Sequence, residues 1–150
     1  SEADQDDAEA KEARNDQIKS VRNAGAKAFG KKFAKRILGS QPTPENLDFL
    51  TSLMNGTKPN ALIAGLRLLR DRPDLKPYLP HIKVPALIVA GKEDPHSPPA
   101  LMAKTAALFP HGHFHTMANT RHLSAIECPQ SATEMIKDWV LSGIAPSPNS

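Results

Sequence analysis

The feature that most constrains the fold is a short apolar run at residues 86–90, which lies between Pro85 and Gly91. A continuous apolar run of this length is typical of a strand buried on both faces of a parallel sheet. Asp94 follows directly, and a proline-rich turn and a helical pattern come next. Open α/β sheets place ligands and chemistry beyond the carboxyl ends of their strands, so Asp94 is a candidate functional residue. On this observation alone, an ordinary loop or helix-capping acid is an equal alternative.

A second strand-to-helix unit follows and carries His122 in its loop. The predicted strand covers residues 113–117. The distance from Asp94 to His122 suits one helix, one strand and their turns, which is the crossover that joins adjacent parallel strands. We therefore expect the acid and the histidine at the same edge of the sheet. An acid followed by a histidine is the second half of the Ser…Asp/Glu…His chain order of α/β-hydrolases.

Roughly residues 61–142 resemble the C-terminal part of the α/β-hydrolase family. The resemblance is carried by an ordered set of positions: Leu79, Ile82, Val84, Pro85, Leu87, Gly91, Asp94, Pro98, Ala106, Phe109, Pro110, His122, Leu123, Glu127, Pro129 and Trp139. It implies that Asp94 is the acid and His122 the base of a catalytic triad. Residues 1–60 resemble, more weakly, the helical lid that many members insert before their last two strands.

Two departures from the family pattern stand out. Arg121 precedes the histidine where the family usually has a small residue, often glycine. No Gly-x-Ser-x-Gly occurs anywhere in the sequence, so the nucleophile elbow is absent. In family members this elbow, the oxyanion-hole loop and the earlier strands lie upstream of the lid. The chain is therefore predicted to be the back half of a hydrolase, completed by a missing N-terminal half of the fold.

The predicted fold class is α/β: a partial α/β-hydrolase fold, with a helical lid followed by two parallel βα units. We expect a lid or cap region at residues 1–74, the C-terminal part of the core at 75–142 and a flexible tail at 143–150. Two strands do not make a stable sheet by themselves, and an exposed apolar edge is a pairing hazard. This is a second reason to expect upstream sequence or a partner chain.

Three helices are predicted in the first half of the chain. Residues 5–38 form one long helix, broken near Gly25, with an apolar stripe at Ile18, Val21, Ala28, Phe29, Phe33 and Ile37. Thr43 caps a second helix that has Pro44 at its first position. A third helix, residues 59–70, is expected to bury Leu62, Leu66 and Leu69. The charged residues 70–74 either gate a pocket or, as we prefer, form a solvated connector with local ion pairs.

Three boundaries are predicted in the second half of the chain. Residues 75–79 form a short turn that leads into the first strand. Ser97 caps the helix after Asp94, with Pro98 at its first position and an end near residue 108. The final helix covers residues 131–141.

The long helix carries segregated charge. Residues 19–36 contain seven Lys or Arg and no acid, whereas the residues before them are acidic. A solvated helix whose charges match its macrodipole explains this pattern better than a nucleic-acid surface does. No aromatic residue lies between the basic residues to stack on bases. A net charge of +3 is also too small to imply a polyanionic partner. We expect no nucleic acid and no membrane as partners, because no apolar stretch has membrane length.

Other candidate residues have ordinary explanations. His113 and His115 share one face of a strand, but two ligands are too few for a metal, so exposed positions are preferred and neither a metal nor a cofactor is expected. Ser124 is not expected to be a nucleophile, because it lacks the strained elbow. Cys128 is expected to be a small apolar residue that packs against a turn. A single cysteine fits a reducing compartment, so a cytoplasmic location is expected. His81 and His96 are predicted at the surface, and His96 is near enough to Asp94 to approach a pocket.

The predicted function is hydrolysis of a small-molecule carboxylic ester, or related acyl group, by a Ser-His-Asp triad whose serine lies outside this chain. Substrate-binding residues are not identified. Two alternatives stay open. One is a non-catalytic helical interaction module that uses residues 19–36 to bind an acidic partner, and the other is a degenerate hydrolase-like scaffold.

Overall fold

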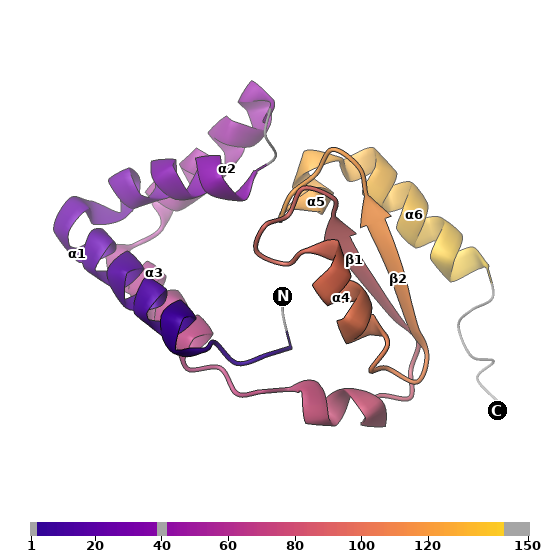
Figure 1. Cartoon of the computed structure of the whole chain (residues 1–150). Coiled ribbons are helices and arrows are strands. Elements are labelled where there is room, and N and C mark those ends of the chain that lie inside the picture. Colours follow the sequence, from indigo (N-terminus) through magenta and orange to yellow (C-terminus); the bar gives the residue numbers. More distant parts are fainter. Residues whose placement is uncertain (1–2, 39–41, 143–150) are drawn as a thin grey trace. The chain divides into compact units, whose positions relative to one another are not determined.

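The computed structural model describes residues 3–38 and 42–142, and its elements are labelled in Figure 1. The chain divides into two compact units. The helical unit comprises Asp4–Ile37 and Pro42–Asp74, and the main segment of the α/β unit begins at Leu75. Residues 143–150, which were expected to form a flexible tail, lie outside the described residues.

The helical unit is built around α1 (Ala8–Ile37), the predicted long helix, which bends at Gly25 as expected. Gly25 has φ 79° and ψ 167°, a conformation that residues with a side chain rarely adopt. Ala28 is exposed and Phe33 is only half-buried, so these two residues of the apolar stripe do not belong to the core. The bend resets the phase of the buried stripe. Beyond it, the buried residues are Ala26, Phe29, Gly30, Ala34 and Ile37.

The two following helices begin at prolines. α2 (Pro44–Gly56) starts as predicted, because the Oγ1 atom of Thr43 accepts a hydrogen bond of 3.2 Å from the N–H of Asn46. α3 (Pro59–Arg70) has the predicted bounds. Both helices pack against α1. Their buried residues are Leu50, Met54, Ile63 and Leu66. Leu69 was predicted to be buried but is 41% exposed, because α3 turns the Ile63 side of the helix inward.

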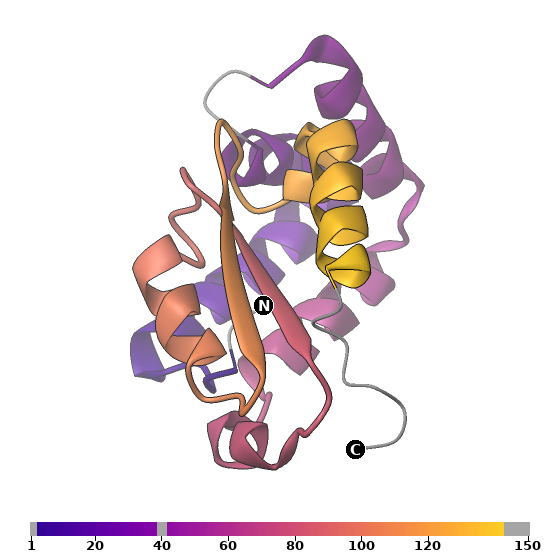
Figure 2. The same cartoon turned by 90° about the vertical axis from the view of Figure 1, so that its right-hand side faces the viewer.

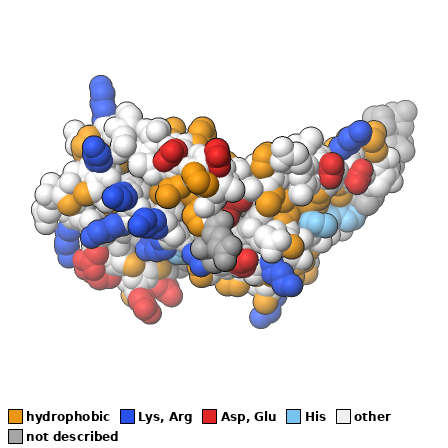
Figure 3. Space-filling model, turned by 90° about the horizontal axis from the view of Figure 1, so that it is seen from above, with side chains coloured by type: hydrophobic (Ala, Val, Ile, Leu, Met, Phe, Trp, Pro, Cys, Tyr) orange, Lys and Arg blue, Asp and Glu red, His pale blue; other side chains and the backbone are white. Residues whose placement is uncertain are grey.

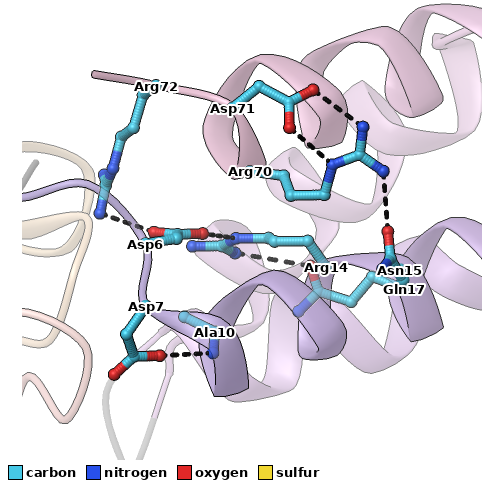
Figure 4. Close-up of polar contacts among 9 residues, drawn as sticks. All are labelled: Asp6, Asp7, Ala10, Arg14, Asn15, Gln17, Arg70, Asp71 and Arg72. Atoms are coloured by element: carbon cyan, nitrogen blue, oxygen red, sulfur yellow. Dashed lines mark hydrogen bonds and ion pairs between the residues drawn. The ribbon is translucent and has the colours of Figure 1, made fainter.

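A buried carboxylate ties the two ends of the helical unit together (Figure 4). The Asp6 side chain is 3% exposed, and its two oxygens accept hydrogen bonds from Arg14 Nε at 3.1 Å and Arg72 Nη2 at 2.8 Å. Arg70 and Asp71 form the local ion pair expected in the connector, at 2.8 Å. Arg72 also makes a long-range ion pair, with the buried Asp6 that lies before α1.

The α/β unit contains a short 3₁₀ helix, two strands and three α-helices. In chain order they are η1 (Lys76–His81), β1 (Ala86–Gly91), α4 (Pro99–Ala106), β2 (Gly112–Met117), α5 (Ser124–Glu127) and α6 (Pro129–Leu141). The strands pair in parallel, with a register that runs from Ala86 opposite Gly112 to Gly91 opposite Met117. α4 forms the crossover and packs against both strands. Figure 2 shows α4 and α6 on opposite sides of the strand pair.

The apolar run of β1 is less buried than the sequence predicts. Leu87, Ile88 and Val89 are half-buried, while Ala90 and Gly91 are buried. The reason is that the sheet of the described residues has two strands, so β1 is covered along one edge only. The hydrophobic core of the unit gathers instead around Leu79, Ala90, Met102, Ala106, Met117 and Ala132.

Two helices of the α/β unit, α4 and α6, have bounds that differ from prediction. α4 begins at Pro99 and ends at Ala106, and Ser97 does not cap it. The backbone N–H of Ser97 instead donates to the carboxylate of Asp94, which holds the segment in a turn. α6 begins at Pro129 rather than at residue 131, with proline in the first turn where its missing N–H costs nothing. None of the helices in the described ranges combines the length and apolar character needed to cross a bilayer.

Candidate active site

The two parallel strands end at the same edge of the sheet, and each delivers one functional side chain there. Asp94 lies in the turn after β1, where its N–H donates to Gly91 O at 3.1 Å. His122 lies in the loop after β2. The Nδ1 atom of His122 is 2.8 Å from Oδ2 of Asp94. The structure therefore brings together the two residues that the sequence places at one sheet edge. Their catalytic roles stay a prediction.

The environment of Asp94 keeps its carboxyl group ionised. Burial raises the pKa of Asp94, but hydrogen bonds from the His122 ring and from the backbone N–H groups of His96 and Ser97 outweigh burial, so the pKa lies below its ordinary value. The His96 N–H donates to Oδ1 at 2.8 Å, which leaves Oδ2 for the imidazole. An ionised carboxylate only accepts hydrogen bonds, so Nδ1 of neutral His122 carries the proton and Nε2 keeps its lone pair. This is the tautomer of a general base.

The loop after β2 lies unusually close to the end of β1. A Cβ atom added at Gly91 would lie 2.0 Å from the carbonyl oxygen of Arg121 and 2.5 Å from that of Thr120. Only glycine leaves room for this approach. The Thr120 carbonyl then accepts a hydrogen bond from Glu93 N–H at 3.0 Å. The two loops are thus joined through their backbones as well as through the acid–histidine pair.

Two residues shape the start of the histidine loop. Thr120 is fully buried, and its hydroxyl donates to Met117 O at 3.1 Å. Asn119 has φ 56°, and it is the one non-glycine residue with positive φ among the described residues. Arg121 therefore adopts a backbone conformation open to any L residue. Its difference from the small residue of the family pattern creates no backbone strain at this position.

A second histidine lies against the pair. The rings of His96 and His122 meet edge to face, with centroids 5.9 Å apart. His96 was predicted at the surface with the possibility of approaching the pocket, and it is half-buried beside His122. His81 is exposed, as expected.

The remaining candidates do not join this site as reactive groups. His113 packs against Trp139, with ring centroids 6.2 Å apart, and His115 is exposed. The described part of the chain holds no group of three or more His, Cys, Asp or Glu side chains placed to bind a metal ion. Ser124 is the first residue of α5, and Cys128 is a half-buried free cysteine.

Sequence reasoning assigned no role to Glu127, although it formed part of the family pattern. Its Oε1 atom accepts hydrogen bonds from the backbone N–H groups of Arg121 at 3.0 Å and Leu123 at 3.2 Å. These are the two residues that flank His122. The available signal was a glutamate at the end of a short helix that directly follows the histidine, but nothing in the sequence shows which N–H groups it accepts.

Comparisons with known proteins bear on the fold of the chain. The chain is 37% identical over 84 residues to a pimeloyl-[acyl-carrier protein] methyl ester esterase of Xanthomonas oryzae, a match that covers 56% of this chain and 33% of that protein. A thermophilic esterase from Thermogutta terrifontis superposes with a TM-score of 0.84 at 26% identity, over 93% of this chain and 53% of that one. The enol-lactonase of Burkholderia xenovorans has the same fold, with a TM-score of 0.75 at 21% identity, over 87% of this chain and 50% of the enzyme.

No protein-family model matches the chain. The fold and the relatives nevertheless define its class: helices joined to a small parallel sheet, matching the C-terminal part of α/β-hydrolase structures. The chain resembles the C-terminal part of α/β-hydrolases in sequence and in fold. It spans about a third of the length of the curated relatives and about half of the solved structures that it matches.

Proposed function

We propose that this chain supplies the acid and the base of a serine-type hydrolase that cleaves a carboxylic ester or a related acyl group. Asp94 is the acid and His122 the base. The observation that carries the proposal is the 2.8 Å contact between His122 Nδ1 and a buried, ionised Asp94. The relatives that are named as esterases support the choice of bond.

The proposed reaction follows from this tautomer. His122 Nε2 removes the proton of a serine hydroxyl as the serine oxygen attacks the carbonyl carbon of the ester. Asp94 orients the ring and stabilises the imidazolium. The imidazolium returns the proton to the departing alkoxide as the bond between the alkoxide oxygen and the carbonyl carbon breaks, which leaves an acyl-enzyme. Water then attacks by the same route and releases the carboxylic acid and the free serine.

The nucleophile and the oxyanion donors have to come from polypeptide outside these 150 residues, because the sequence contains no Gly-x-Ser-x-Gly. The surface of the α/β unit supports such a partner. Val84, two residues before β1, is 64% exposed, and Ile136 and Val140 on α6 are 50% and 54% exposed. Ile136 and Val140 are four residues apart and so share one face of α6, and an exposed apolar face is typical of an interaction surface. We therefore propose that the missing N-terminal half of the fold covers them, and that the chain alone is inactive.

The test is a covalent fusion of the chain to the N-terminal half of the Thermogutta terrifontis esterase, assayed with a p-nitrophenyl ester. Asp94→Asn should lower kcat on the order of 10⁴-fold, and His122→Ala on the order of 10⁶-fold, as loss of the triad acid and base does elsewhere. The exposed His81→Ala is the matched control and should leave the rate unchanged. Full activity in the His122→Ala fusion would refute the proposal, and robust hydrolysis by the chain alone would refute its inactivity.

The substrate class is proposed from two sources. The curated relatives act on a methyl ester of a carrier-bound pimeloyl group, according to their name, and a structural neighbour acts on an enol-lactone. Residues 1–74 are proposed to act as the lid over the acyl group. Their exposed apolar side chains, Phe49, Leu53 and Leu68, suit a small or medium-sized ester. We also propose a cytoplasmic location, because the lone Cys128 is a free thiol.

A second candidate function is binding of an acidic partner by α1. Lys27, Lys31 and Lys35 repeat at intervals of one helical turn, all three are exposed, and no carboxylate within the described ranges pairs with them. Figure 3 shows Lys and Arg side chains gathered over the helical unit. Binding of an acidic partner is compatible with a hydrolase, with a non-catalytic interaction module and with a degenerate scaffold.

Binding of the chain to a poly-glutamate peptide tests the second candidate. Binding should weaken with salt and fall at least about tenfold in the double variant Lys31→Glu, Lys35→Glu, because opposite surface potentials drive such encounters. Lys58→Glu, an exposed lysine at the start of α3, is the matched control. Absence of binding at low salt would refute this candidate and leave the hydrolase proposal untouched.

A further inference from the structure

We propose that Glu127 is a positioning residue for His122, and this inference rests on the proposed hydrolase function. One oxygen of Glu127, Oε1, accepts the backbone N–H groups of Arg121 at 3.0 Å and Leu123 at 3.2 Å. The carboxylate thereby holds the peptide groups on both sides of the histidine. Glu127 acts on the ring through the backbone that carries it.

A reciprocal bond anchors Glu127 itself. The backbone N–H of Glu127 donates to Leu123 O at 2.9 Å, while the side chain of Glu127 accepts from the N–H of Leu123. The two residues close a small ring around one turn, in the manner of a capping box. α5 has no other side-chain cap at its first turn, since Leu123 occupies the N-cap position. The four-residue helix α5 therefore depends on this carboxylate for its shape.

The other side of the histidine loop is already fixed, by Thr120 and by the close approach to Gly91. Glu127 completes the restraint from the side that faces α5. Hydrogen bonds weaken steeply as their geometry departs from the optimum, so the 2.8 Å contact of His122 with Asp94 requires a fixed backbone on both sides of the ring. A carboxylate suits the task because charge-assisted bonds to backbone N–H groups are stronger than neutral ones.

The first experiment is NMR of the full 150-residue chain with ¹⁵N-labelled histidine. Wild type should show His122 as the Nδ1–H tautomer, with the downfield proton of a bond to a carboxylate. Glu127→Ala should lose that proton signal and mix the tautomers while the sheet amide signals stay. Glu127→Gln should restore it, because one carbonyl oxygen can accept both N–H groups. Glu134→Ala, an exposed glutamate on α6, is the matched control and should match wild type.

An unchanged His122 signal in Glu127→Ala would overturn the proposal. If that variant does not fold, Glu127→Asp takes its place, because it keeps the charge but shortens the reach by one methylene. An unchanged His122 signal in Glu127→Asp overturns the proposal equally.

The second experiment uses the esterase fusion. Glu127→Ala should lower kcat about 10²-fold with KM unchanged, the loss expected from a small misplacement of a catalytic group, and Glu127→Gln should recover most of it. The two proposals fail separately. If the fusion is inactive but Glu127→Ala still loses the His122 proton signal, the hydrolase proposal is refuted and the positioning role stands. If Glu127→Ala has a normal His122 spectrum and a normal kcat, the positioning role alone is refuted.

Discussion

Replacing Gly91 by alanine should damage the candidate site more than any other single methyl group added to a described glycine. The new Cβ would lie 2.0 Å from Arg121 O, 2.5 Å from Thr120 O and 2.8 Å from Arg121 C. All three are backbone atoms, so no side-chain rotation relieves the contact. Real Cβ contacts essentially never fall below 3.0 Å, so the loop has to move by about 1 Å.

The magnitude follows from two losses. Forcing an extra methyl group into a closely packed region costs about 1–3 kcal/mol. The displaced Thr120 carbonyl also loses its 3.0 Å bond from Glu93, which is worth about 1 kcal/mol. We therefore expect Gly91→Ala to lower the free energy of unfolding of the α/β unit by about 2–4 kcal/mol, a large part of a typical domain's total of about 5–15 kcal/mol.

Urea denaturation followed by fluorescence measures this loss, because the single tryptophan, Trp139, lies on α6 of the same unit. The His122 proton signal should disappear at the same time. Gly65→Ala in α3 is the matched control: its Cβ meets no heavy atom within 4 Å, and alanine favours a helix by up to about 1 kcal/mol. The urea midpoint of Gly65→Ala, followed by far-UV circular dichroism, should be unchanged or raised. A Gly91→Ala variant that is as stable as wild type and keeps the His122 signal would refute the reasoning.

Three further predictions concern charge and backbone. Because the pKa of Asp94 is lowered by folding, its carboxylate stabilises the chain above the ordinary aspartate pKa of about 3.9, and this contribution disappears as the pH falls through the lower folded value. The free energy of unfolding, measured by urea titration, should therefore fall less for Asp94→Asn than for wild type between about pH 5 and pH 2. An equal fall in the two proteins would contradict this. Asp6→Asn should cost about 1–3 kcal/mol in thermal unfolding, because it removes the buried negative charge that the part-buried guanidinium groups of Arg14 and Arg72 share. Asp16→Asn, in an exposed pair, should cost less than Asp6→Asn, and equal costs would argue against burial as the cause. Gly25→Ala should destabilise the helical unit by about 1–2 kcal/mol, because its positive φ strains a residue with a side chain, and an unchanged midpoint by circular dichroism would show that the bend straightens freely.

Near-neighbour chemistry explains what could be predicted about the fold. Thr43 followed by Pro44 marks a helix start from two adjacent residues, and the structure shows the expected cap. Gly25 marks the bend in α1. The apolar run after Pro85 marks β1. In each case the residues that decide the structure are within a few positions of one another, so the sequence displays them together.

The errors have two origins. Ser97 looks like a helix cap, but its N–H donates to Asp94 three residues earlier, so a competing local turn forms instead. The other errors come from contacts between distant segments. Phe33 and Ala28 fit a regular stripe, but the change of phase at Gly25 depends on how α1 packs against α2 and α3. The half-buried state of the β1 strand depends on how many strands pair with it, which local periodicity does not contain.

For the candidate site, the sequence alone determined the order of an acid and a histidine after two parallel strands, because strand direction and crossover length follow from local patterns. Only the tertiary structure decided that Nδ1 of His122 meets Oδ2 of Asp94, that Gly91 makes room for the Arg121 carbonyl, and that Glu127 holds the loop. The contacts of Gly91 and Glu127 involve backbone atoms, which every residue has, so residue types alone do not show which segments meet. The exact atoms of the acid–histidine contact depend on distances that only packing sets.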